Sequence, residues 1–313
     1  MRVAVIGAGA VGGYFGGKLA QAGEDVAFVA RGASLRVMRE SGLRVDSCDG
    51  DFVINPVHAT DDATEIGAVD VVLLAVKAWQ VPEAIAAMRP LIGPNTVAVP
   101  LLNGVEAPDQ LAAEYGISRV AGGLCRLFGS VVGPGYVRNV MAQTFIAFGE
   151  LDTTHSGRME GLRRAFDRAG VRAEIAADIR AALWEKLLFV GPFGRVGAAT
   201  RAPIGVIRSL PETRALLVGA MTEIFRVAQA RSIAVAEDAV AQALALIDGS
   251  PEQATASMQR DIVADRPSEL EAQVGVVVRL AQEAGVAAPC HTSLYASLLP
   301  QERRARGEVV FPA

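Results

Sequence analysis

The sequence predicts an α/β fold in which a parallel-sheet unit is followed by an all-α unit. Short β-branched runs alternate with helical segments through most of the first half. A glycine-rich turn joins the first of these runs to the first helical segment. From about Asp178 onward the pattern is helical, with almost no strand character. We therefore divide the 313 residues into a domain at 1–177 and a helical domain at 178–313.

The first predicted strand, residues 2–6 (RVAVI), leads into a turn with the spacing G-x-G-x-x-G. The turn is Gly7-Ala8-Gly9-Ala10-Val11-Gly12. Here Gly7 permits the turn, Gly9 lets the backbone approach a pyrophosphate, and Gly12 lets helix and strand pack closely. A strand, this turn and a helix in succession indicate a Rossmann-type dinucleotide site, so residues 7–12 are predicted to bind the cofactor.

The second predicted strand, residues 25–30, ends without the acidic residue that usually binds the ribose 2′-hydroxyl of NAD. The chain has Ala30 and then Arg31 at this point. An arginine cannot accept that hydrogen bond, but its fork of donors can bind a 2′-phosphate. We therefore predict NADP(H) as the cofactor, with Arg31 as a contact. The alternative is that Arg31 only faces solvent.

Two further buried strands are predicted at 69–80 and 96–104, with Lys77 at the end of the first and Asn103 at the end of the second. Ligands of open α/β sheets bind beyond the carboxyl ends of the strands. Lys77 and Asn103 are therefore expected on the same edge as the glycine turn, as part of the site. Residues 142–151 and 171–176 read as later strands around a helix at 157–170, and we expect them to extend the same sheet.

The second half contains long helices with wide apolar faces, which predicts a packed helical bundle. Ser209 and Glu212 have the spacing of a capping box, with Pro211 in the first turn of the helix. The same device is expected again at Ser250, Pro251 and Gln253. A later helix is expected to end at Gly285 as its C-cap.

Composition narrows the range of partners. The net charge of −4 argues against a nucleic-acid partner. No apolar run reaches the length of a membrane span, and the glycines of the N-terminal segment argue against a signal peptide.

The three scattered cysteines fit free thiols in a reducing compartment, so a cytoplasmic location is expected. The three histidines lack metal-ligand spacing, so no metal site is predicted. The oligomeric state is left open, with a homodimer as one candidate.

One lysine lies in unusually apolar surroundings. Lys186 follows Trp184 and precedes Leu187 in the helical stretch RAALWEKLLFV, residues 180–190. A lone helical lysine in such a place usually lays its stem on apolar surface and keeps its ammonium in water. From the local sequence alone, that is the expected role of Lys186.

Over its whole length the chain resembles the ketopantoate reductases (2-dehydropantoate 2-reductases). The resemblance is carried by five stretches in a specific order. These are GAGAVGG at 7–13, VKAWQ at 76–80, LLNG at 101–104, LWEKL at 183–187 and SMQRDIVADRPSELE at 257–271. The family reduces the 2-oxo group of ketopantoate with NADPH to form pantoate, in pantothenate biosynthesis. The resemblance therefore implies a two-domain, NADP-dependent oxidoreductase acting on a small 2-oxo acid.

The resemblance also implies roles for individual residues. Lys186 matches the catalytic lysine of the family, Glu269 its acidic partner and Ser257 its substrate-carboxylate contact. Asn103 and Lys77 match polar residues beside the nicotinamide, and Asn103 also faces the substrate. We interpret Lys186 as the general acid and Glu269 as the residue that orients it.

The chain departs from the family at several substrate contacts. Val190, Gly194, Ala254 and Val274 stand where the family often has asparagines. These departures favour an alternative, the reduction of a different 2-oxo acid or ketone. Arg195 or Arg201 is a candidate for a substitute carboxylate contact, although a structural role suits each as well. A second alternative is a regulator that binds NADPH without catalysis.

Overall fold

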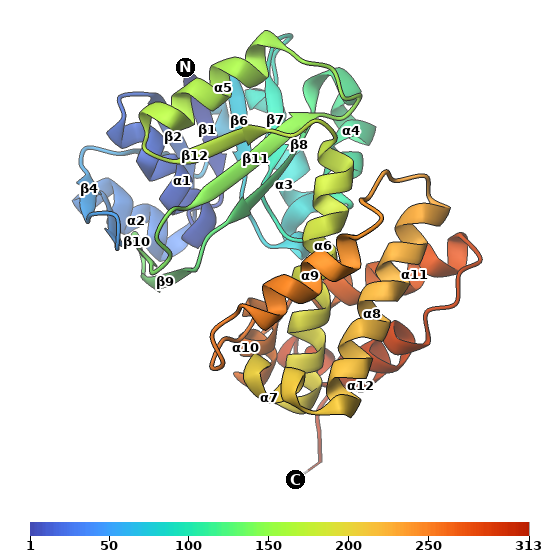
Figure 1. Ribbon diagram of the computed structural model, residues 1–313. Coiled ribbons are helices and arrows are strands. Elements are labelled where there is room, and N and C mark those ends of the chain that lie inside the picture. Colours follow the sequence, from blue (N-terminus) through green and yellow to red (C-terminus); the bar gives the residue numbers. More distant parts are fainter. Residues whose placement is uncertain (313) are drawn as a thin grey trace. The chain divides into compact units, whose positions relative to one another are not determined.

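The computed structural model describes residues 1–312 and divides the chain into two units (Figure 1). The first comprises Met1–Leu102 and Glu106–Ile179, and the second comprises Asn103–Val105 and the chain from Arg180 onward. The main division thus falls two residues beyond the boundary placed at 177/178. The sequence-based division had not separated residues 103–105 from the first domain.

The first unit is built around a five-stranded, all-parallel sheet of order β5-β2-β1-β6-β7. Its strands are β1 (Arg2–Ile6), β2 (Asp25–Val29), β5 (His58–Thr60), β6 (Val71–Leu74) and β7 (Val97–Pro100). The helices of this part are α1 (Ala10–Gln21), α2 (Gly32–Ser41), α3 (Val81–Ala87) and α4 (Ala107–Tyr115). Short 3₁₀ helices are η1 (Ala63–Glu65), η2 (Ala78–Gln80), η3 (Arg89–Leu91) and η4 (Ile117–Arg119). The central strands β1, β6 and β7 are almost wholly buried, as in parallel sheets covered on both faces.

Two smaller sheets complete the first unit. One has the order β4-β3-β10-β9 and the other the order β12-β11-β8. Their strands are β3 (Leu43–Ser47), β4 (Phe52–Ile54), β8 (Ala121–Arg126), β9 (Gly129–Gly133), β10 (Tyr136–Asn139), β11 (Phe145–Glu150) and β12 (Arg172–Ile175). Helix α5 (Gly157–Arg168) lies along β12 and β11 (Figure 1).

The expectation that the later strands extend the first sheet was wrong. β11 pairs antiparallel with β8 and parallel with β12, and these three strands form a sheet of their own. An isolated bridge, Ala98 to Val120, links the chain just before β8 to β7, and Gly123 of β8 packs against Val99 of β7, whereas the strand pairing of β8 is with β11. The two sheets share one core instead, because Phe15 of α1 meets Phe166 of α5 edge-on, with ring centroids 6.0 Å apart.

The strands that lead toward the predicted site are shorter than expected. β6 ends at Leu74 and β7 at Pro100, so Lys77 lies three residues beyond its strand. Lys77 is the N-cap of η2, and its extended backbone already belongs to the loop. Both strand predictions ran on because apolar residues continue into these loops, although after β6 they are only partly buried and Trp79 is exposed.

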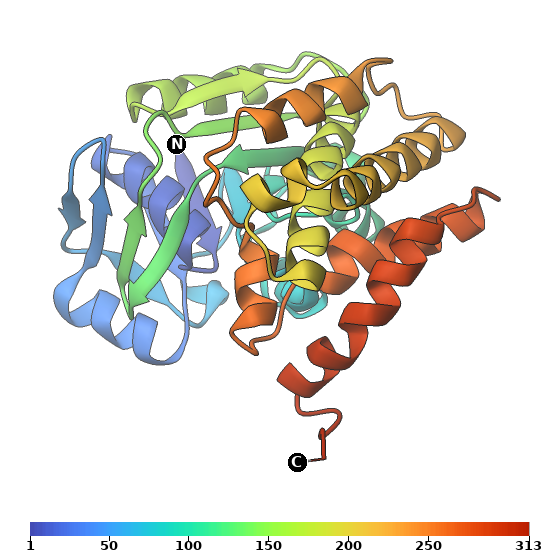
Figure 2. The ribbon, with the colours of Figure 1, turned by 60° about the horizontal axis from the view of Figure 1, so that its bottom comes forward.

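The second unit is helical, as predicted, and has no β-strand among its described residues. Its helices are α6 (Ile179–Thr200), α7 (Ile204–Ser209), α8 (Pro211–Ala230), α9 (Ala239–Asp248), α10 (Ser257–Val263), α11 (Val276–Glu283) and α12 (Pro289–Ala305), with α6 starting at the last residue of the first unit. A π-helical turn, η5 (Glu271–Gly275), precedes α11. α12 is the last helix of the chain and is drawn in red in Figure 2.

The two predicted capping boxes are not formed. The N-cap of α8 is Leu210, because Ser209 still belongs to α7 and its hydroxyl donates back to Val206 O. Ser250 likewise donates back, to Leu246 O at the end of α9. Both serines therefore satisfy carbonyls of the preceding helix rather than N–H groups of the next one. Gly285, in contrast, has the left-handed backbone (φ +66°) expected just beyond the end of α11.

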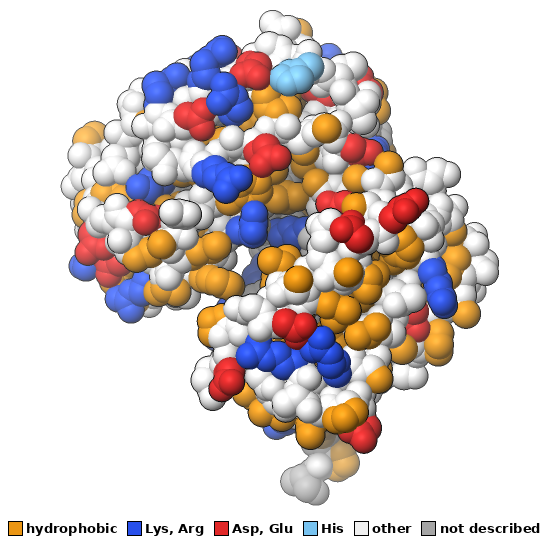
Figure 3. All heavy atoms as spheres, viewed as in Figure 1, with side chains coloured by type: hydrophobic (Ala, Val, Ile, Leu, Met, Phe, Trp, Pro, Cys, Tyr) orange, Lys and Arg blue, Asp and Glu red, His pale blue; other side chains and the backbone are white. Residues whose placement is uncertain are grey.

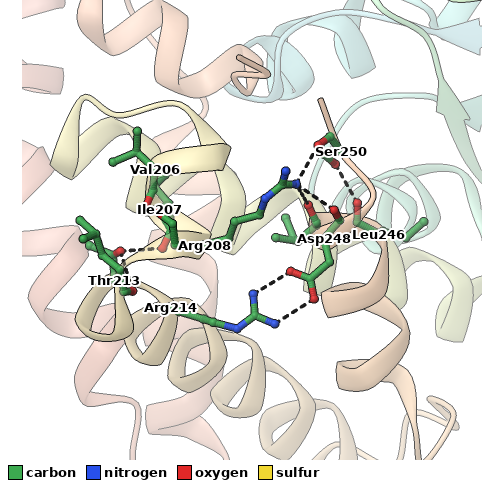
Figure 4. Close-up of polar contacts among 11 residues, drawn as sticks. Val206, Ile207, Arg208, Thr213, Arg214, Leu246, Asp248 and Ser250 are labelled. Carbon is green, nitrogen blue, oxygen red and sulfur yellow. Dashed lines mark hydrogen bonds and ion pairs between the residues drawn. The ribbon is translucent and has the colours of Figure 1, made fainter. Parts of the chain in front are cut away.

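Two arginines tie the end of α9 to α7 and α8 (Figure 4). Nη1 of Arg208 donates to the carbonyl oxygens of Ile247, Asp248 and Ser250, at 3.0, 2.9 and 2.7 Å. The guanidinium fork of Arg214 binds both carboxylate oxygens of Asp248, at 2.6 and 2.8 Å. A cation at a helix C-terminus satisfies its unpaired carbonyls and its partial negative charge.

On the face shown in Figure 3, basic side chains lie over α5 with acidic side chains beside them. Two arginines of α5 form ion pairs. Arg158 binds Glu150 at 2.5 Å, and Arg163 binds Asp167 at 2.6 Å. The surface over α5 therefore carries mixed charge and lacks the one-sign character of a polyanion-binding face. Among residues 1–312, no helix combines the length and apolarity needed to cross a membrane.

A buried glutamate of α8 binds the first turn of α12, the last helix of the second unit. Glu223 of α8 accepts hydrogen bonds from the backbone N–H groups of Cys290 and His291, at 2.7 and 2.9 Å. It also accepts from Nδ1 of His291 at 2.6 Å. Burial lowers the pKa of His291 to about 3, with a further lowering by the positive charge of Arg195, although Glu223 opposes the shift. His291 is therefore neutral at physiological pH.

This burial predicts a specific pH dependence of stability. The unfolded chain protonates His291 below about pH 6.5, whereas the folded chain resists protonation until about pH 3. The free energy of unfolding should therefore fall as the pH drops through this window, by up to about 1.4 kcal/mol per pH unit from this group. Denaturant titrations of the His291→Asn variant should show a correspondingly shallower slope. The matched variant His58→Asn, at an exposed position of β5, should keep the parent slope. Equal slopes for His291→Asn and the parent would contradict this account.

Candidate functional site

The glycine turn after β1 has the geometry that its three glycines predict. Gly7 has φ +97°, and a Cβ atom there would lie 2.8 Å from Ala75 O. A Cβ on Gly12 would lie only 2.0 Å from Gly7 O, so the first turn of α1 touches the backbone of the loop. Gly9 differs from both, because a Cβ there would meet nothing within 4 Å. Two glycines are thus required by packing, whereas Gly9 borders open space.

The N-terminus of α1 is suited to bind an anion. Its N-cap, Gly9, is extended and offers no side-chain hydrogen bond, and the first turn contains no acidic residue. Ala8, Ala10 and Val11 complete the turn and carry no polar side chain. Backbone N–H groups at such a terminus, with the positive end of the helix dipole, attract phosphate groups.

Arg31 lies two residues beyond the end of β2, in the connection where the sequence placed it. It is the N-cap residue of α2 and is exposed. Its Nη1 forms an ion pair with Oε1 of Glu83, in the first turn of α3. β2 and β6 both neighbour β1, so the loops after all three strands leave the same edge of the sheet. The pairing with Glu83 had no sequence signal, because 52 residues separate the two.

Lys77 also lies on this edge. Its backbone N–H donates to Oε1 of Gln80 at 3.1 Å, which closes the short η2 helix. Its ammonium lies 5.8 Å from the ring centroid of Trp79. Lys77, Arg31 and the glycine turn therefore all belong to the carboxyl edge of one parallel sheet, as the motif spacing predicted.

Asn103 belongs to the second unit, together with Gly104 and Val105. Its Nδ2 donates to Oε2 of Glu269 at 3.1 Å. Gly104 has φ +101°, and a Cβ there would lie 2.9 Å from Ala272 O, so this loop packs directly on the π-helical turn. Two residues that the sequence analysis selected from distant stretches, Asn103 and Glu269, are therefore in contact.

Glu269 is buried and is held by a second donor that the sequence analysis missed. Nε2 of Gln273 reaches the same carboxylate oxygen, Oε2, at 3.2 Å. Gln273 is itself buried and lies four residues after Glu269, within η5. The spacing of four residues was the available signal, because it places two side chains on one helix face.

Arg195 supports this arrangement from the core of the second unit. It is wholly buried, and its Nη2 donates to the backbone carbonyl of Gln273 at 2.8 Å. The guanidinium lies over Gly191, where a Cβ would come within 2.1 Å of Nη2. Its burial places Arg195 among the internal polar groups of the unit. Arg201, the other arginine considered as a carboxylate contact, is exposed at the end of α6, with φ +57°.

Lys186 is half-buried on α6, between the buried side chains of Trp184 and Leu187. Within residues 1–312 its ammonium has no hydrogen bond or ion pair. Lys186 and Glu269 therefore share no hydrogen bond or ion pair among the described residues, and Oε2 of Glu269 is held by Asn103 and Gln273. Both residues belong to the same helical unit.

Ser257 is the first residue of α10 and is exposed. The start of α10 packs against α6 at Gly194, where a Cβ would lie 3.3 Å from Cε of Met258 and 3.4 Å from Cβ of Ala256. A longer side chain at position 194 would need Met258 to move. Close packing of these two helices thus accounts for a glycine at this position.

The two units define a class of protein in which an α/β unit, with a glycine turn suited to bind phosphate, precedes a helical unit. Comparison with known proteins identifies the family within this class. The sequence model described as "Ketopantoate reductase PanE/ApbA" matches residues 3–153, and the model of the C-terminal domain of the same family matches residues 178–302. The chain belongs to the PanE/ApbA ketopantoate reductase family and is an oxidoreductase, which confirms the resemblance seen in its motifs.

Individual relatives extend over nearly the full chain. A 2-dehydropantoate 2-reductase of Mesorhizobium japonicum is 32% identical over 312 residues, covering 90% of this chain and 91% of the relative. The Bacillus subtilis protein YkpB, described as an uncharacterized oxidoreductase, is 29% identical and covers 95% of this chain and 98% of its own length. The crystal structure of a 2-dehydropantoate 2-reductase from Geobacter metallireducens superposes with a TM-score of 0.89, at 32% identity over 96% of this chain and 99% of that one.

The contrast between Gly9 and Gly12 gives a matched test of the glycine turn. Gly12→Ser should destabilise the protein by about 1–3 kcal/mol, because its side chain must displace the backbone at Gly7. Gly9→Ser should leave the melting temperature unchanged, since there is space for the side chain and serine is a good N-cap. The same Gly9→Ser variant should bind dinucleotides more weakly, as measured by fluorescence titration. Unchanged dinucleotide affinity in that variant would contradict the assignment of this turn as the phosphate site.

Proposed function

We propose that the protein is an NADPH-dependent 2-dehydropantoate 2-reductase, which reduces ketopantoate to pantoate. The observation that carries the proposal is the hydrogen bond between Asn103 and the buried Glu269, in the same unit as Lys186. Three stretches far apart in the sequence thereby supply an amide, a carboxylate and an ammonium to one helical unit of a family of oxidoreductases. The amide and the ammonium are hydrogen-bond donors, and they complement the oxygen acceptors of a small 2-oxo acid.

The proposed cofactor is NADP(H). Its support is the glycine turn at the N-terminus of α1 and the presence of Arg31 where an NAD-binding site commonly has an acid. The guanidinium can bind a 2′-phosphate through two N–H groups, which a ribose hydroxyl cannot match. When bound, the reduced nicotinamide supplies the hydride that adds to the 2-oxo carbon.

In the proposed mechanism, Lys186 stabilises the negative charge that develops on the carbonyl oxygen and then donates a proton to it. The C–H bond and the O–H bond of the alcohol are both formed, and the lysine is left as a neutral amine that solvent reprotonates. Asn103 and Glu269 are proposed to orient the substrate and the lysine, and Ser257 to bind the substrate carboxylate. Gln273 and Arg195 hold the carboxylate and its helical turn from within the unit.

Lys186→Ala should lower kcat by about 10²–10⁴-fold, the range typical of general acid catalysis. Binding of NADPH, measured by fluorescence titration, should be unaffected. Lys186→Arg is the matched control, because it keeps the positive charge but cannot give up its proton. That variant should remain far below the parent in kcat. Near-normal turnover of Lys186→Ala would refute the assignment of the general acid.

A second candidate is the reduction of a different 2-oxo acid or ketone. The chain has apolar or small residues at positions where the family often has asparagines, and two of them have packing roles. Val274 is wholly buried in the core around Leu270 and Leu298, and Gly194 accommodates α10. These positions cannot offer hydrogen bonds from a side chain to a polar substrate, which favours a substrate with a more apolar substituent.

A substrate profile separates the candidates. The purified protein is mixed with NADPH and ketopantoate, or with 2-oxo acids that carry branched or aromatic substituents, and the absorbance of the reduced nicotinamide is followed. The highest kcat/KM with ketopantoate supports the first function, and a clear preference for another 2-oxo acid supports the second. Tight NADPH binding without oxidation by any ketone would refute both and would favour a regulator that binds NADPH without catalysis.

A further inference from the structure

The ion pair between Arg31 and Glu83 joins two loops of the first unit at the carboxyl edge of its sheet. Arg31 follows β2, and Glu83 lies in the first turn of α3, which follows β6. Both side chains are more than half exposed, at 59% and 63%. The positive end of the α3 dipole favours a carboxylate at position 83 whether or not Arg31 is present. Glu83 is therefore a fixed negative charge beside Arg31.

The Glu83 carboxylate is paired with the Arg31 guanidinium, the group that the proposed function assigns to the 2′-phosphate of NADPH. A phosphate bound to the guanidinium of Arg31 would lie next to the Glu83 carboxylate, because both anions contact the same group. The two anions would repel each other. The pair is exposed, so it contributes little to stability and can open when a ligand binds. Opening the ion pair and the remaining repulsion therefore weaken the binding of NADPH and leave the binding of NADH unaffected.

Glu83 also supplies a missing element of NAD recognition. The end of β2 carries Ala30, which is buried and cannot accept a hydrogen bond from a ribose 2′-hydroxyl. Glu83 brings a carboxylate to the same edge of the sheet from a different strand–helix connection. The edge thus holds both a donor group suited to a 2′-phosphate and an acceptor group suited to a 2′-hydroxyl.

We propose that Glu83 is a cofactor-specificity residue that restrains the preference of Arg31 for NADPH and keeps NADH usable. The proposal rests on the proposed function through the assignment of Arg31 to the 2′-phosphate. It makes Glu83, rather than Arg31 alone, the residue that determines the ratio of the two affinities.

The test compares the dissociation constants of NADPH and NADH by fluorescence titration of the intact protein. Glu83→Gln should tighten NADPH binding by about 3- to 30-fold, because one negative charge beside the phosphate is removed at an exposed site. NADH binding should not tighten and should weaken by up to about threefold, because NADH lacks the phosphate and its ribose 2′-hydroxyl loses an acceptor. The matched control is Glu114→Gln, which removes the carboxylate of another exposed ion pair of this unit, with Arg89. This control should leave the ratio of the two affinities unchanged.

Two outcomes for Glu83→Gln overturn the proposal. An unchanged ratio of affinities means that Glu83 has no influence on the cofactor, and weaker NADPH binding means that Glu83 orients Arg31 for the phosphate. Arg31→Ala, measured alongside, distinguishes this failure from a failure of the cofactor assignment. It should weaken NADPH binding far more than NADH binding. Equal losses for the two cofactors in Arg31→Ala would overturn the assignment of Arg31 and the role of Glu83 together.

Discussion

The close approach of α1 to the strands beneath it is the constraint on which the first unit depends. Gly12 touches the carbonyl of Gly7, and a Cβ on Gly16 would lie 2.7 Å from both Phe28 and Val5. Because these positions have no side chain, the helix settles against the sheet with its N-terminus directly above the turn after β1. The same contact that packs the helix therefore aims its free N–H groups beyond the sheet edge. The packing of the helix and the orientation of its free N–H groups therefore both follow from this close contact.

The second unit depends on a polar arrangement of a different kind. Glu269 is removed from water but remains satisfied, because Asn103 and Gln273 both donate to it. Arg195 holds the carbonyl of Gln273 in the π-helical turn, a widened helical geometry that is frequent at functional sites. The pairing is incomplete at Arg195, whose Nε and Nη1 are buried without a partner among the described residues. The hydrogen bonds from Asn103 and Gln273 are therefore what fixes the position of the Glu269 carboxylate. A carboxylate held in this way keeps its position without help from a bound ligand.

The parts of the structure that could be predicted from the sequence are those whose causes are local. The glycine turn, the first two strands and the helical second half each follow from a spacing that extends over a few residues. The separate sheet of β8, β11 and β12 was missed because periodicity identifies strands but not their partners. The capping boxes at Ser209 and Ser250 failed because a serine at that spacing can also donate backward, and the preceding helix competed for it. The ion pair of Arg31 and the buried contacts of Arg195 depend on residues distant in the chain, which no local pattern records.

The grouping of Asn103–Val105 with the helical unit has a consequence for the connectivity of the protein. The chain leaves the first unit after Leu102, returns at Glu106 and leaves again after Ile179, so three peptide junctions join the two units rather than one. A truncation at the last junction would not yield two intact halves. The C-terminal fragment would lack the amide that donates to Glu269, and the N-terminal fragment would carry a left-handed Gly104 whose neighbour, the carbonyl of Ala272, had been removed. Evolutionary exchange of one half for another must therefore also preserve this three-residue loop.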